Sequence, residues 1–180
     1  FIHYASMLNV RLEFGLQTIH QTEGAAVNRK NNMKKVQENI IKVRDAGIEH
    51  EVSVIYGLPE QTLASFVKTI EWCLFMKIPA IKAFPLMLLR GTDTEKNKKK
   101  WGLVESEDSM PVVIKSDTFS HEDWLKMSKI SQSLKDTENN HPLFLEDLLK
   151  LGDESKIQFE RFQPFAKKIL TPVTKEAEIY

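Results

Sequence analysis

The sequence predicts an α/β fold whose strands run parallel, and the order of its segments is the main evidence. Two segments, Arg11–Ile19 and Glu51–Gly57, alternate in side-chain character with the period of a β-strand. Each is followed by a segment with apolar residues at helical spacing, and a third strand-like segment covers Ala80–Met87. Strands that are separated by helices and short connections pair in parallel through right-handed crossovers.

The first strand has two faces of different character. One face is apolar and consists of Leu12, Phe14 and Leu16. The other face is mainly polar and consists of Glu13, Gly15 and Gln17. A polar connection follows, and the next helix is expected to begin after Asn31 or Asn32, either of which can cap its first turn. Its apolar stripe runs from Met33 to Val43, and Gly47 is expected to end it in a left-handed conformation.

The second strand leads into a turn and a second helix. The turn has the sequence Gly57-Leu58-Pro59-Glu60-Gln61-Thr62. Apolar residues then recur at helical spacing, and the helix is expected to stop before Pro79. The third strand follows, and Gly91-Thr92 breaks the chain after it.

The pattern changes after about residue 104. Pro111–Lys115 is a candidate short strand, and Ser120 with Asp123 three residues later predicts the start of a helix that runs to about Lys135. Two amphipathic segments follow, at residues 143–151 and 159–170. We therefore predict two parts, an α/β domain over residues 1–104 and a mostly helical extension over residues 105–180.

Composition narrows the classes of function. Lys+Arg and Asp+Glu both number 25, so no net charge favours nucleic acid or an anionic membrane, and no apolar stretch is long enough to span a bilayer. The single cysteine, Cys73, excludes an internal disulfide framework and a multi-cysteine metal site within this chain, and it suits a reducing cytoplasm. The chain opens at Phe1 with residues expected to end a helix, so we expect it to be a piece of a longer protein.

Four strings of residues, in this order and spacing, resemble the motifs of the radical S-adenosylmethionine (SAM) superfamily. They are Gly15-Leu16-Gln17-Thr18, Asn28-Arg29, Val54-Ile55-Tyr56-Gly57-Leu58-Pro59-Glu60-Gln61-Thr62 and Arg90-Gly91-Thr92. The resemblance covers residues 1–104 and is greatest to the branch that contains oxygen-independent coproporphyrinogen dehydrogenase, cobalamin-dependent members and RNA methylthiotransferases. It implies that the three parallel strands are the second half of a partial (β/α) barrel, similar to a TIM barrel.

The resemblance also implies cofactors and roles. The intact enzyme would use a [4Fe–4S] cluster to cleave SAM reductively, and the resulting 5′-deoxyadenosyl radical would abstract hydrogen from an unknown substrate. Gln17 would bind the ribose, Ile55 would pack on the adenine and Arg29 would bind the methionine carboxylate through its planar fork. Three further residues complete the expected cofactor site: Ser53, Gly57 and Glu60. Glu60 has a second interpretation, as a charge at the start of the helix near Thr62.

Two departures from the family pattern limit these expectations. Relatives often carry an acidic residue where this chain has Ser53, which leaves the ribose contacts open. The three cluster cysteines lie outside this chain, so we expect the chain alone to be inactive and its first strand to leave an unpaired edge. The missing N-terminal half of the barrel or a partner chain would cover that edge. The alternatives are a non-catalytic module that binds SAM or a nucleotide, and an interaction subunit that pairs through the edge.

Overall fold

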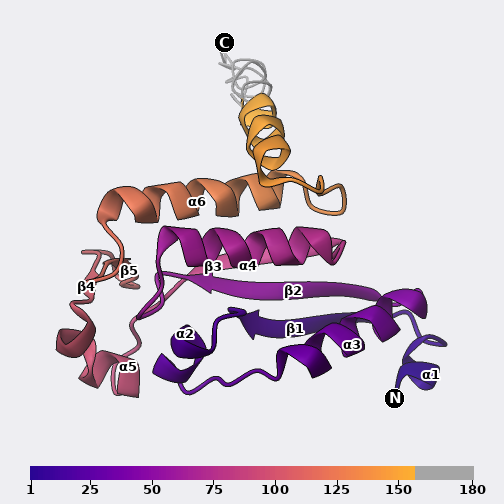
Figure 1. Cartoon of the computed structure of the whole chain (residues 1–180), viewed down its shortest axis with the longest axis horizontal. Helices are drawn as coiled ribbons and strands as arrows, with labels where there is room; N and C mark the ends of the chain where they lie inside the picture. Colours follow the sequence, from indigo (N-terminus) through magenta and orange to yellow (C-terminus); the bar gives the residue numbers. More distant parts are fainter. Residues whose placement is uncertain (157–180) are drawn as a thin grey trace, which may run out of the picture.

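The computed structural model describes residues 1–156 and contains the predicted parallel sheet. Its three strands are β1 (Arg11–Gln17), β2 (Glu49–Tyr56) and β3 (Ala80–Pro85), in the order β1-β2-β3. Both pairings are parallel, and Figure 1 shows the strands side by side. The α/β class and its parallel strands are therefore confirmed.

Two helices connect the strands and pack on one face of the sheet. They are α3 (Met33–Asp45) and α4 (Leu63–Phe75), shown in front of the strands in Figure 1. The Asn32 side chain accepts a hydrogen bond from the Lys35 amide (3.1 Å), and Gly47 follows α3 at φ +68°. Thr62 begins α4 in a reciprocal capping box with Ser65.

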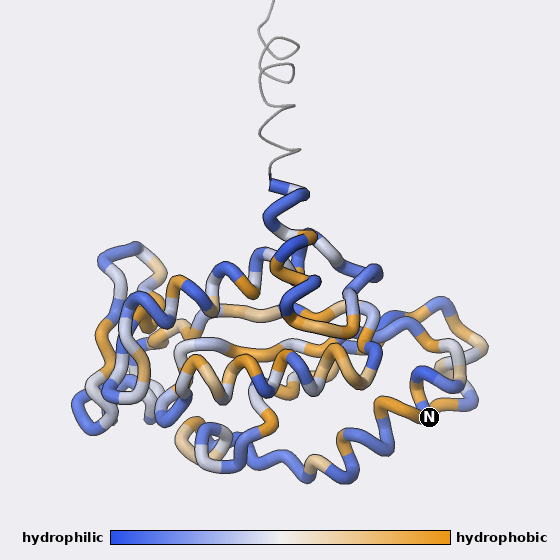
Figure 2. The backbone as a smooth tube through the Cα atoms, turned by 45° about the horizontal axis from the view of Figure 1, so that its top comes forward, coloured by the Kyte–Doolittle hydropathy of each residue, from blue (hydrophilic) through white to orange (hydrophobic). Residues whose placement is uncertain are grey.

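The face of the sheet under these helices forms the hydrophobic core. Leu16, Val52 and Val54 are almost fully buried there, together with Phe66 and Ile70 of α4. Figure 2 shows the strands as a mostly hydrophobic band, with hydrophilic stretches on the helices around it. Burial of apolar side chains is the main force that holds α4 on the sheet.

The opposite face of the sheet is polar. The register places Glu13 beside Glu51 and Gly15 beside Ser53. Arg11 and Lys82 both form ion pairs with Glu51, at 2.8 and 2.9 Å. The side chains of this face alternate along each strand with those that face the core.

Shorter elements surround the sheet. α1 (Ile2–Ala5) precedes β1 and α2 (Gln21–Ala26) follows its C-terminal end, and α2 forms where the sequence predicted only a polar connection (Figure 1). After β3 the chain forms α5 (Asp93–Lys96), a 3₁₀ helix at Lys98–Trp101, the antiparallel pair β4 (Val104–Glu105) and β5 (Val113–Lys115), and α6 (His121–Asp136).

The extension agrees with the sequence over the residues that can be compared. Ser120 and Asp123 form the predicted capping box of α6, and residues 145–156 are helical. The amphipathic segment predicted at residues 159–170 lies outside the described residues. The division of the chain at residue 104 remains a prediction. None of the helices in the described region is long and apolar enough to cross a bilayer.

The two edges of the sheet have different neighbours. Along β3, the Asn139 amide donates to the Pro79 carbonyl (2.7 Å) and the Ile81 amide donates to His141 Nε2 (3.1 Å). Ser131 Oγ of α6 donates to the Ala83 carbonyl (2.7 Å). Along the outer edge of β1, no strand pairs within residues 1–156. Residues of the chain therefore cover the edge of β3, whereas no strand within residues 1–156 pairs with the outer edge of β1.

Candidate functional site

The first part of the candidate site is the end of β1, where Gln17 lies. A bulge between Gly15 and Gln17 and a φ of +60° at Gln17 end the strand. The Gln17 side chain lies over Gly15, since a Cβ placed on Gly15 would lie 2.8 Å from Gln17 Nε2. Gly15 therefore leaves the space that the Gln17 amide occupies.

The amide oxygen of Gln17 has an unusual environment. Gln17 Oε1 is buried and has no hydrogen-bond partner in the described part of the chain. A buried acceptor without a partner costs about 1–3 kcal/mol, so such atoms are good candidates for contact with a ligand. Gln17 Oε1 is therefore an available acceptor on the polar face of the sheet, and its role as a binding residue remains a prediction.

Ser53 and Ile55 lie on β2 beside this position. Ser53 pairs in register with Gly15 and donates its hydroxyl hydrogen to the Glu13 carboxylate. Ile55 lies two residues further along and is half-buried. The Gln17 side chain lies over Gly15, so it shares the face of Ser53 and Ile55 although the bulge pairs Gln17 itself with Val54.

Gly57 closes β2 and has a structural reason to be glycine. Its φ is +88°, and a Cβ built on it would lie 3.0 Å from the Val113 carbonyl oxygen. Val113 and Phe119 of the chain itself thus approach the backbone of Gly57 closely, and its role in the cofactor site remains a prediction.

Arg29 and Glu60 lie in loops at the same end of the sheet, and both are exposed. The Arg29 amide donates to the Gly24 carbonyl (2.7 Å), and a Cβ on Gly24 would lie only 2.2 Å from the Arg29 carbonyl oxygen. Glu60 borders a hollow of about 570 Å³ that Asn28 also lines. Thr62 and Ser65, and not Glu60, form the N-terminal cap of α4, while the effect of the Glu60 charge near the helix start remains a prediction.

A buried polar cluster that the sequence did not predict lies beneath these loops and consists of Thr18, Glu23 and Gln61. Their exposed fractions are 2%, 1% and 0%. Thr18 Oγ1 donates to Glu23 Oε2 (2.5 Å), and Gln61 Nε2 approaches the same oxygen at 3.4 Å. One carboxylate of α2 therefore joins the loop after β1 to the loop after β2.

Gln61 also fixes the backbone of its own loop. Its Oε1 accepts hydrogen bonds from the amides of Gly57 (2.7 Å) and Leu58 (3.2 Å), and its Nε2 donates to the Ile55 carbonyl (3.1 Å). Thr118 Oγ1, from the extension, donates to the Gln61 carbonyl (2.6 Å). Gln61 thus holds the turn that carries Gly57, and the extension holds Gln61.

The signal for this cluster was weak but present in the sequence. Glu23 precedes Gly24, Ala25 and Ala26, and small residues of this kind allow a short helix to pack closely. A lone carboxylate in such a segment is a candidate for burial with hydrogen-bond donors.

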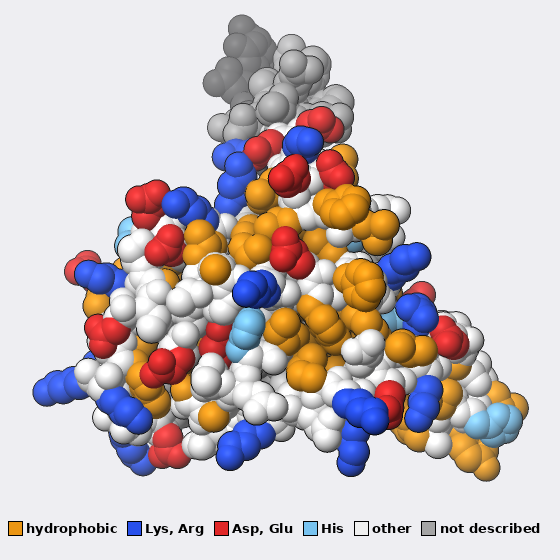
Figure 3. All heavy atoms as spheres, in the orientation of Figure 1, with side chains coloured by type: hydrophobic (Ala, Val, Ile, Leu, Met, Phe, Trp, Pro, Cys, Tyr) orange, Lys and Arg blue, Asp and Glu red, His pale blue; other side chains and the backbone are white. Residues whose placement is uncertain are grey.

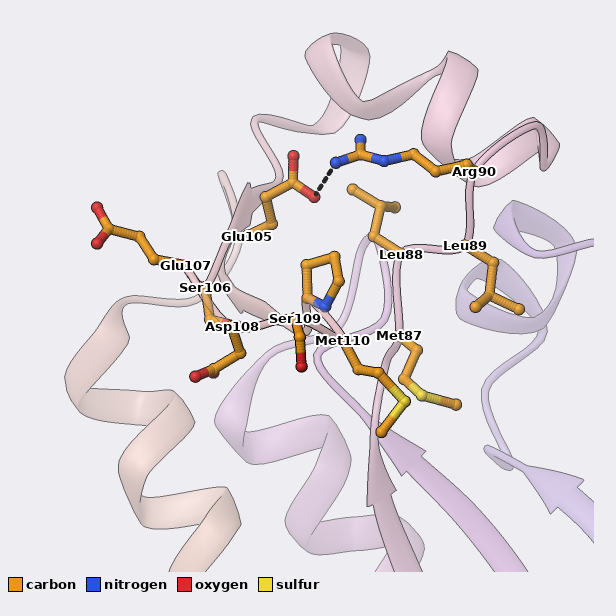
Figure 4. A pocket seen from close by; sticks show the side chains of 11 residues that line it. Met87, Leu88, Leu89, Arg90, Glu105, Ser106, Glu107, Asp108, Ser109 and Met110 are labelled. Carbon is orange, nitrogen blue, oxygen red and sulfur yellow. Dashed lines mark ion pairs between the residues drawn. The ribbon is translucent and has the colours of Figure 1, made fainter.

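A second hollow, of about 580 Å³, lies beyond the C-terminal end of β3 and is lined by residues 87–90 and 105–111. Figure 4 shows Met87 and Met110 close together and the Arg90 side chain directed toward Glu105. Arg90 and Glu105 form an ion pair at 3.6 Å. A hydrogen bond from Lys98 (3.0 Å), with Arg90 nearby, lowers the pKa of the Glu105 carboxyl. The hollow therefore combines apolar walls with a charged rim.

Comparisons with known proteins place this geometry in context. No family model matches the chain. The oxygen-independent coproporphyrinogen III oxidase of Helicobacter pylori (strain J99) is 26% identical over 160 residues, covering 87% of this chain and 28% of that protein. The uncharacterized protein YtqA of Bacillus subtilis is 30% identical over 103 residues, covering 55% of this chain and 32% of that protein.

Solved structures show the same arrangement of elements. The radical SAM methyltransferase TsrM of Kitasatospora setae has a TM-score of 0.54 at 13% identity, over 86% of this chain and 41% of that chain. This chain resembles the radical SAM enzymes in sequence and in fold. The Elp3 protein of Methanocaldococcus infernus has a TM-score of 0.56 at 15% identity, over 89% of this chain and 38% of that chain. The expected fold, part of a radical SAM barrel with a helical extension, is thus confirmed.

No group of three or more His, Cys, Asp or Glu side chains within residues 1–156 could hold a metal ion. Cys73 is fully buried in α4, and burial raises the pKa of its thiol. The chain also spans only 28% of the length of the H. pylori protein.

Proposed function

We propose that this chain is part of a radical SAM iron–sulfur enzyme and supplies residues that orient SAM. The observation that carries the proposal is the buried, unpartnered Oε1 of Gln17 at the C-terminal end of β1. In parallel α/β barrels the chemistry takes place at this end of the strands.

Each proposed contact matches the chemistry of one part of SAM. Gln17 hydrogen-bonds the ribose, and Ile55 offers an apolar surface to the adenine. Arg29 is exposed and makes no ion pair within residues 1–156, so its guanidinium can bind the methionine carboxylate through two parallel hydrogen bonds. Gly57 and Glu60 border the loops that enclose the nucleoside, and the cluster of Thr18, Glu23 and Gln61 holds those loops in place.

The remaining parts of the enzyme lie outside this chain. A [4Fe–4S] cluster on cysteines of the missing part would supply the electron that cleaves SAM to methionine and a 5′-deoxyadenosyl radical. The N-terminal half of the barrel, or a partner chain that takes its place, would pair with the exposed edge of β1. The chain alone would be inactive. We place the protein in the cytoplasm because it has a single, buried cysteine.

For the substrate we propose only where it binds. The hollow beyond β3 lies at the same end of the sheet as Gln17 and Gly57, and its apolar walls suit the non-reacting part of a substrate. Its residues belong mostly to the extension, which is the part expected to differ between enzymes of different specificity.

The test uses the intact protein purified without oxygen. We expect about four irons per protein, and after reduction we expect methionine and 5′-deoxyadenosine in equal amounts. The Gln17→Ala variant should keep its iron and bind SAM roughly tenfold more weakly, as expected for the loss of a buried hydrogen bond. An intact protein that binds SAM without a cluster would instead be a non-catalytic SAM-binding module.

The interaction-subunit alternative is favoured by one observation, the exposed edge of β1. An intact protein that binds no SAM and co-purifies in a 1:1 ratio with a cysteine-bearing subunit would support this alternative and overturn the proposal.

A further inference from the structure

The extension contacts the turn after β2 through an exposed threonine, Thr118. Thr118 Oγ1 donates a hydrogen bond to the Gln61 carbonyl at 2.6 Å, across a sequence separation of 57 residues. Thr118 is exposed, whereas Gln61 is fully buried. The Thr118 hydroxyl therefore acts on the turn from the surface of the protein and not by packing in its core.

The number of donors fixes the direction of the hydrogen bonds around Thr118. The single hydrogen of the Thr118 hydroxyl goes to the Gln61 carbonyl, so Ser116 is the donor in the contact between the two hydroxyls (3.1 Å). Ser116 Oγ accepts in turn from the amides of Thr118 (3.1 Å) and Phe119 (3.3 Å). Hydrogen bonds in such a chain polarise one another, and this chain directs the Thr118 hydroxyl toward Gln61.

Gln61 transmits this contact to the backbone of the turn. Its amide donates to the Leu58 carbonyl (3.2 Å), and its Oε1 accepts from the amides of Gly57 (2.7 Å) and Leu58 (3.2 Å). The extension also approaches Gly57 directly, since a Cβ built there would lie 3.0 Å from the Val113 carbonyl oxygen. The position of Gly57 therefore depends on the extension through Gln61 and through Val113.

The same segment of the extension begins in the wall of the hollow beyond β3. Pro111 lines that hollow, and its carbonyl accepts a hydrogen bond from the Leu88 amide (3.1 Å). Two residues further on, the Val113 amide donates to the Leu86 carbonyl (2.9 Å). One continuous segment thus forms a wall of the hollow at its start and holds the turn at its end.

We infer that Thr118 is a positioning residue of the proposed cofactor site, and that the extension sets the affinity for SAM through it. The inference rests on the proposed function, because SAM is the ligand that the turn of Gly57 binds there. A turn that is held in place before SAM arrives loses less conformational entropy on binding. Because the same segment forms the hollow, the part of the chain that would hold the substrate also controls the cofactor turn.

The test measures SAM binding to the intact protein by isothermal titration calorimetry without oxygen. Thr118→Val keeps the shape of the side chain and removes its donor. We expect the Kd for SAM to rise roughly fivefold, as for the loss of one neutral hydrogen bond. The amides of Gly57 and Leu58 should exchange faster by about the same factor. Thr118→Ser keeps the hydroxyl and should restore both quantities.

A matched variant separates positioning from a general loss of stability. Thr137 Oγ1 donates to the Ser133 carbonyl (2.8 Å) at the C-terminal end of α6, so Thr137→Val removes the same kind of hydrogen bond far from the turn. It should lower the melting temperature but leave the Kd for SAM unchanged. An equal rise in Kd for Thr118→Val and Thr137→Val would overturn the positioning role.

Two further variants test the path of the effect. Gln61→Ala should weaken SAM binding, and Thr118→Val should add little to it in the double variant, because Thr118 acts through Gln61. Pro111→Gly gives the wall of the hollow more backbone freedom and should weaken SAM binding roughly threefold. Pro142→Gly, in the loop after α6, is its control and should change nothing. Additive losses in the double variant would overturn the path through Gln61, and an unchanged Kd in Pro111→Gly would overturn the connection to the hollow.

The outcomes separate this inference from the proposed function. If wild-type protein binds SAM and Thr118→Val binds it equally well, the inference alone is overturned. A wild-type protein that binds no SAM overturns the proposed function and the control of SAM affinity together. The exchange of the Gly57 amide then still decides whether Thr118 positions the turn, because it can be measured without a ligand.

Discussion

The two edges of the sheet differ in how they are covered. The edge of β3 is covered by the chain itself, through Ser131 of α6, the Asn139 amide and His141. The edge of β1 has no such cover among residues 1–156. Unpaired strand edges are sites of association, and proteins usually protect them. The sheet can therefore be extended only beyond β1, which is where the N-terminal half of a barrel would pair.

The surface near the start of β1 supports the same conclusion. Phe1, Tyr4, Met7 and Leu8 are all more than 60% exposed. Figure 3 shows apolar side chains gathered at the lower right corner, over α1. Exposed apolar patches mark surfaces that pack against another part of a protein. An apolar surface of this kind lies beside the open edge of β1, where further chain can pack.

The largest expected effect concerns amide hydrogen exchange at the two edges. In the isolated chain, the β1 amides that do not bond to β2 should exchange about a hundredfold faster than in the intact protein, because they lack a partner. The amides of β3 should differ little between the two. Equal exchange of β1 in both samples, measured by NMR or mass spectrometry, would contradict the idea that further chain covers this edge.

A second prediction concerns Gln61, which connects β1 with β2 at their C-terminal ends. The Gln61→Ala variant should lower the free energy of unfolding by about 2–4 kcal/mol, because it leaves two buried backbone amides without partners and removes one of the two donors to Glu23 Oε2. Chemical denaturation measures this difference. Gln132→Ala, on the exposed side of α6, is the control and should change stability by less than about 0.5 kcal/mol. Similar losses in both variants would exclude a special role for Gln61.

The sheet could be predicted from the sequence because the period of side-chain alternation and the spacing of capping residues are local properties of the chain. The alternation of β1, the cap at Asn32 and the capping box of α6 all follow from neighbouring residues. The contacts of Gln61 and His141 join segments that are far apart in the sequence, such as Glu23 with Gln61 and Ile81 with His141. No local pattern contains such contacts, so only the structure shows them.

The candidate site was predictable in part for the same reason. Sequence alternation placed Gln17 and Ser53 on one face, but it could not show that Glu13 binds Ser53 across the strands. The charge of Glu60 suggested a role at the start of α4, where the structure shows that the nearer hydroxyls of Thr62 and Ser65 form the cap. The cofactor roles of all six predicted residues remain predictions.

A third prediction concerns the cover of the β3 edge. The His141→Ala variant removes the acceptor of the Ile81 amide and should lower the free energy of unfolding by about 1–2 kcal/mol. The exchange of the Ile81 amide should accelerate while β1 is unchanged. His3→Ala, at an exposed position of α1, is the matched control and should have no effect on either quantity. An unchanged Ile81 amide in the His141→Ala variant would show that the edge is protected by other contacts.

The smallest expected effect is a pH dependence at the same histidine. His141 Nε2 accepts a hydrogen bond from the Ile81 amide, so the ring must be neutral there, and burial lowers its pKa from 6.5 although Glu138 opposes this shift. The folded state binds the proton less well than the unfolded state. The stabilisation that the hydrogen bond between neutral His141 and the Ile81 amide provides is therefore complete above pH 6.5. It is lost as the pH falls from 6.5 through the lower pKa of the folded state.

Denaturation curves between pH 7.5 and 5 should show a loss in wild type of roughly a fraction of a kcal/mol, since the ring is partly exposed. His141→Ala should lack this component. A wild-type curve that matches the His141→Ala curve over this range would mean that protonation does not open the contact, and that the β3 edge stays closed at low pH.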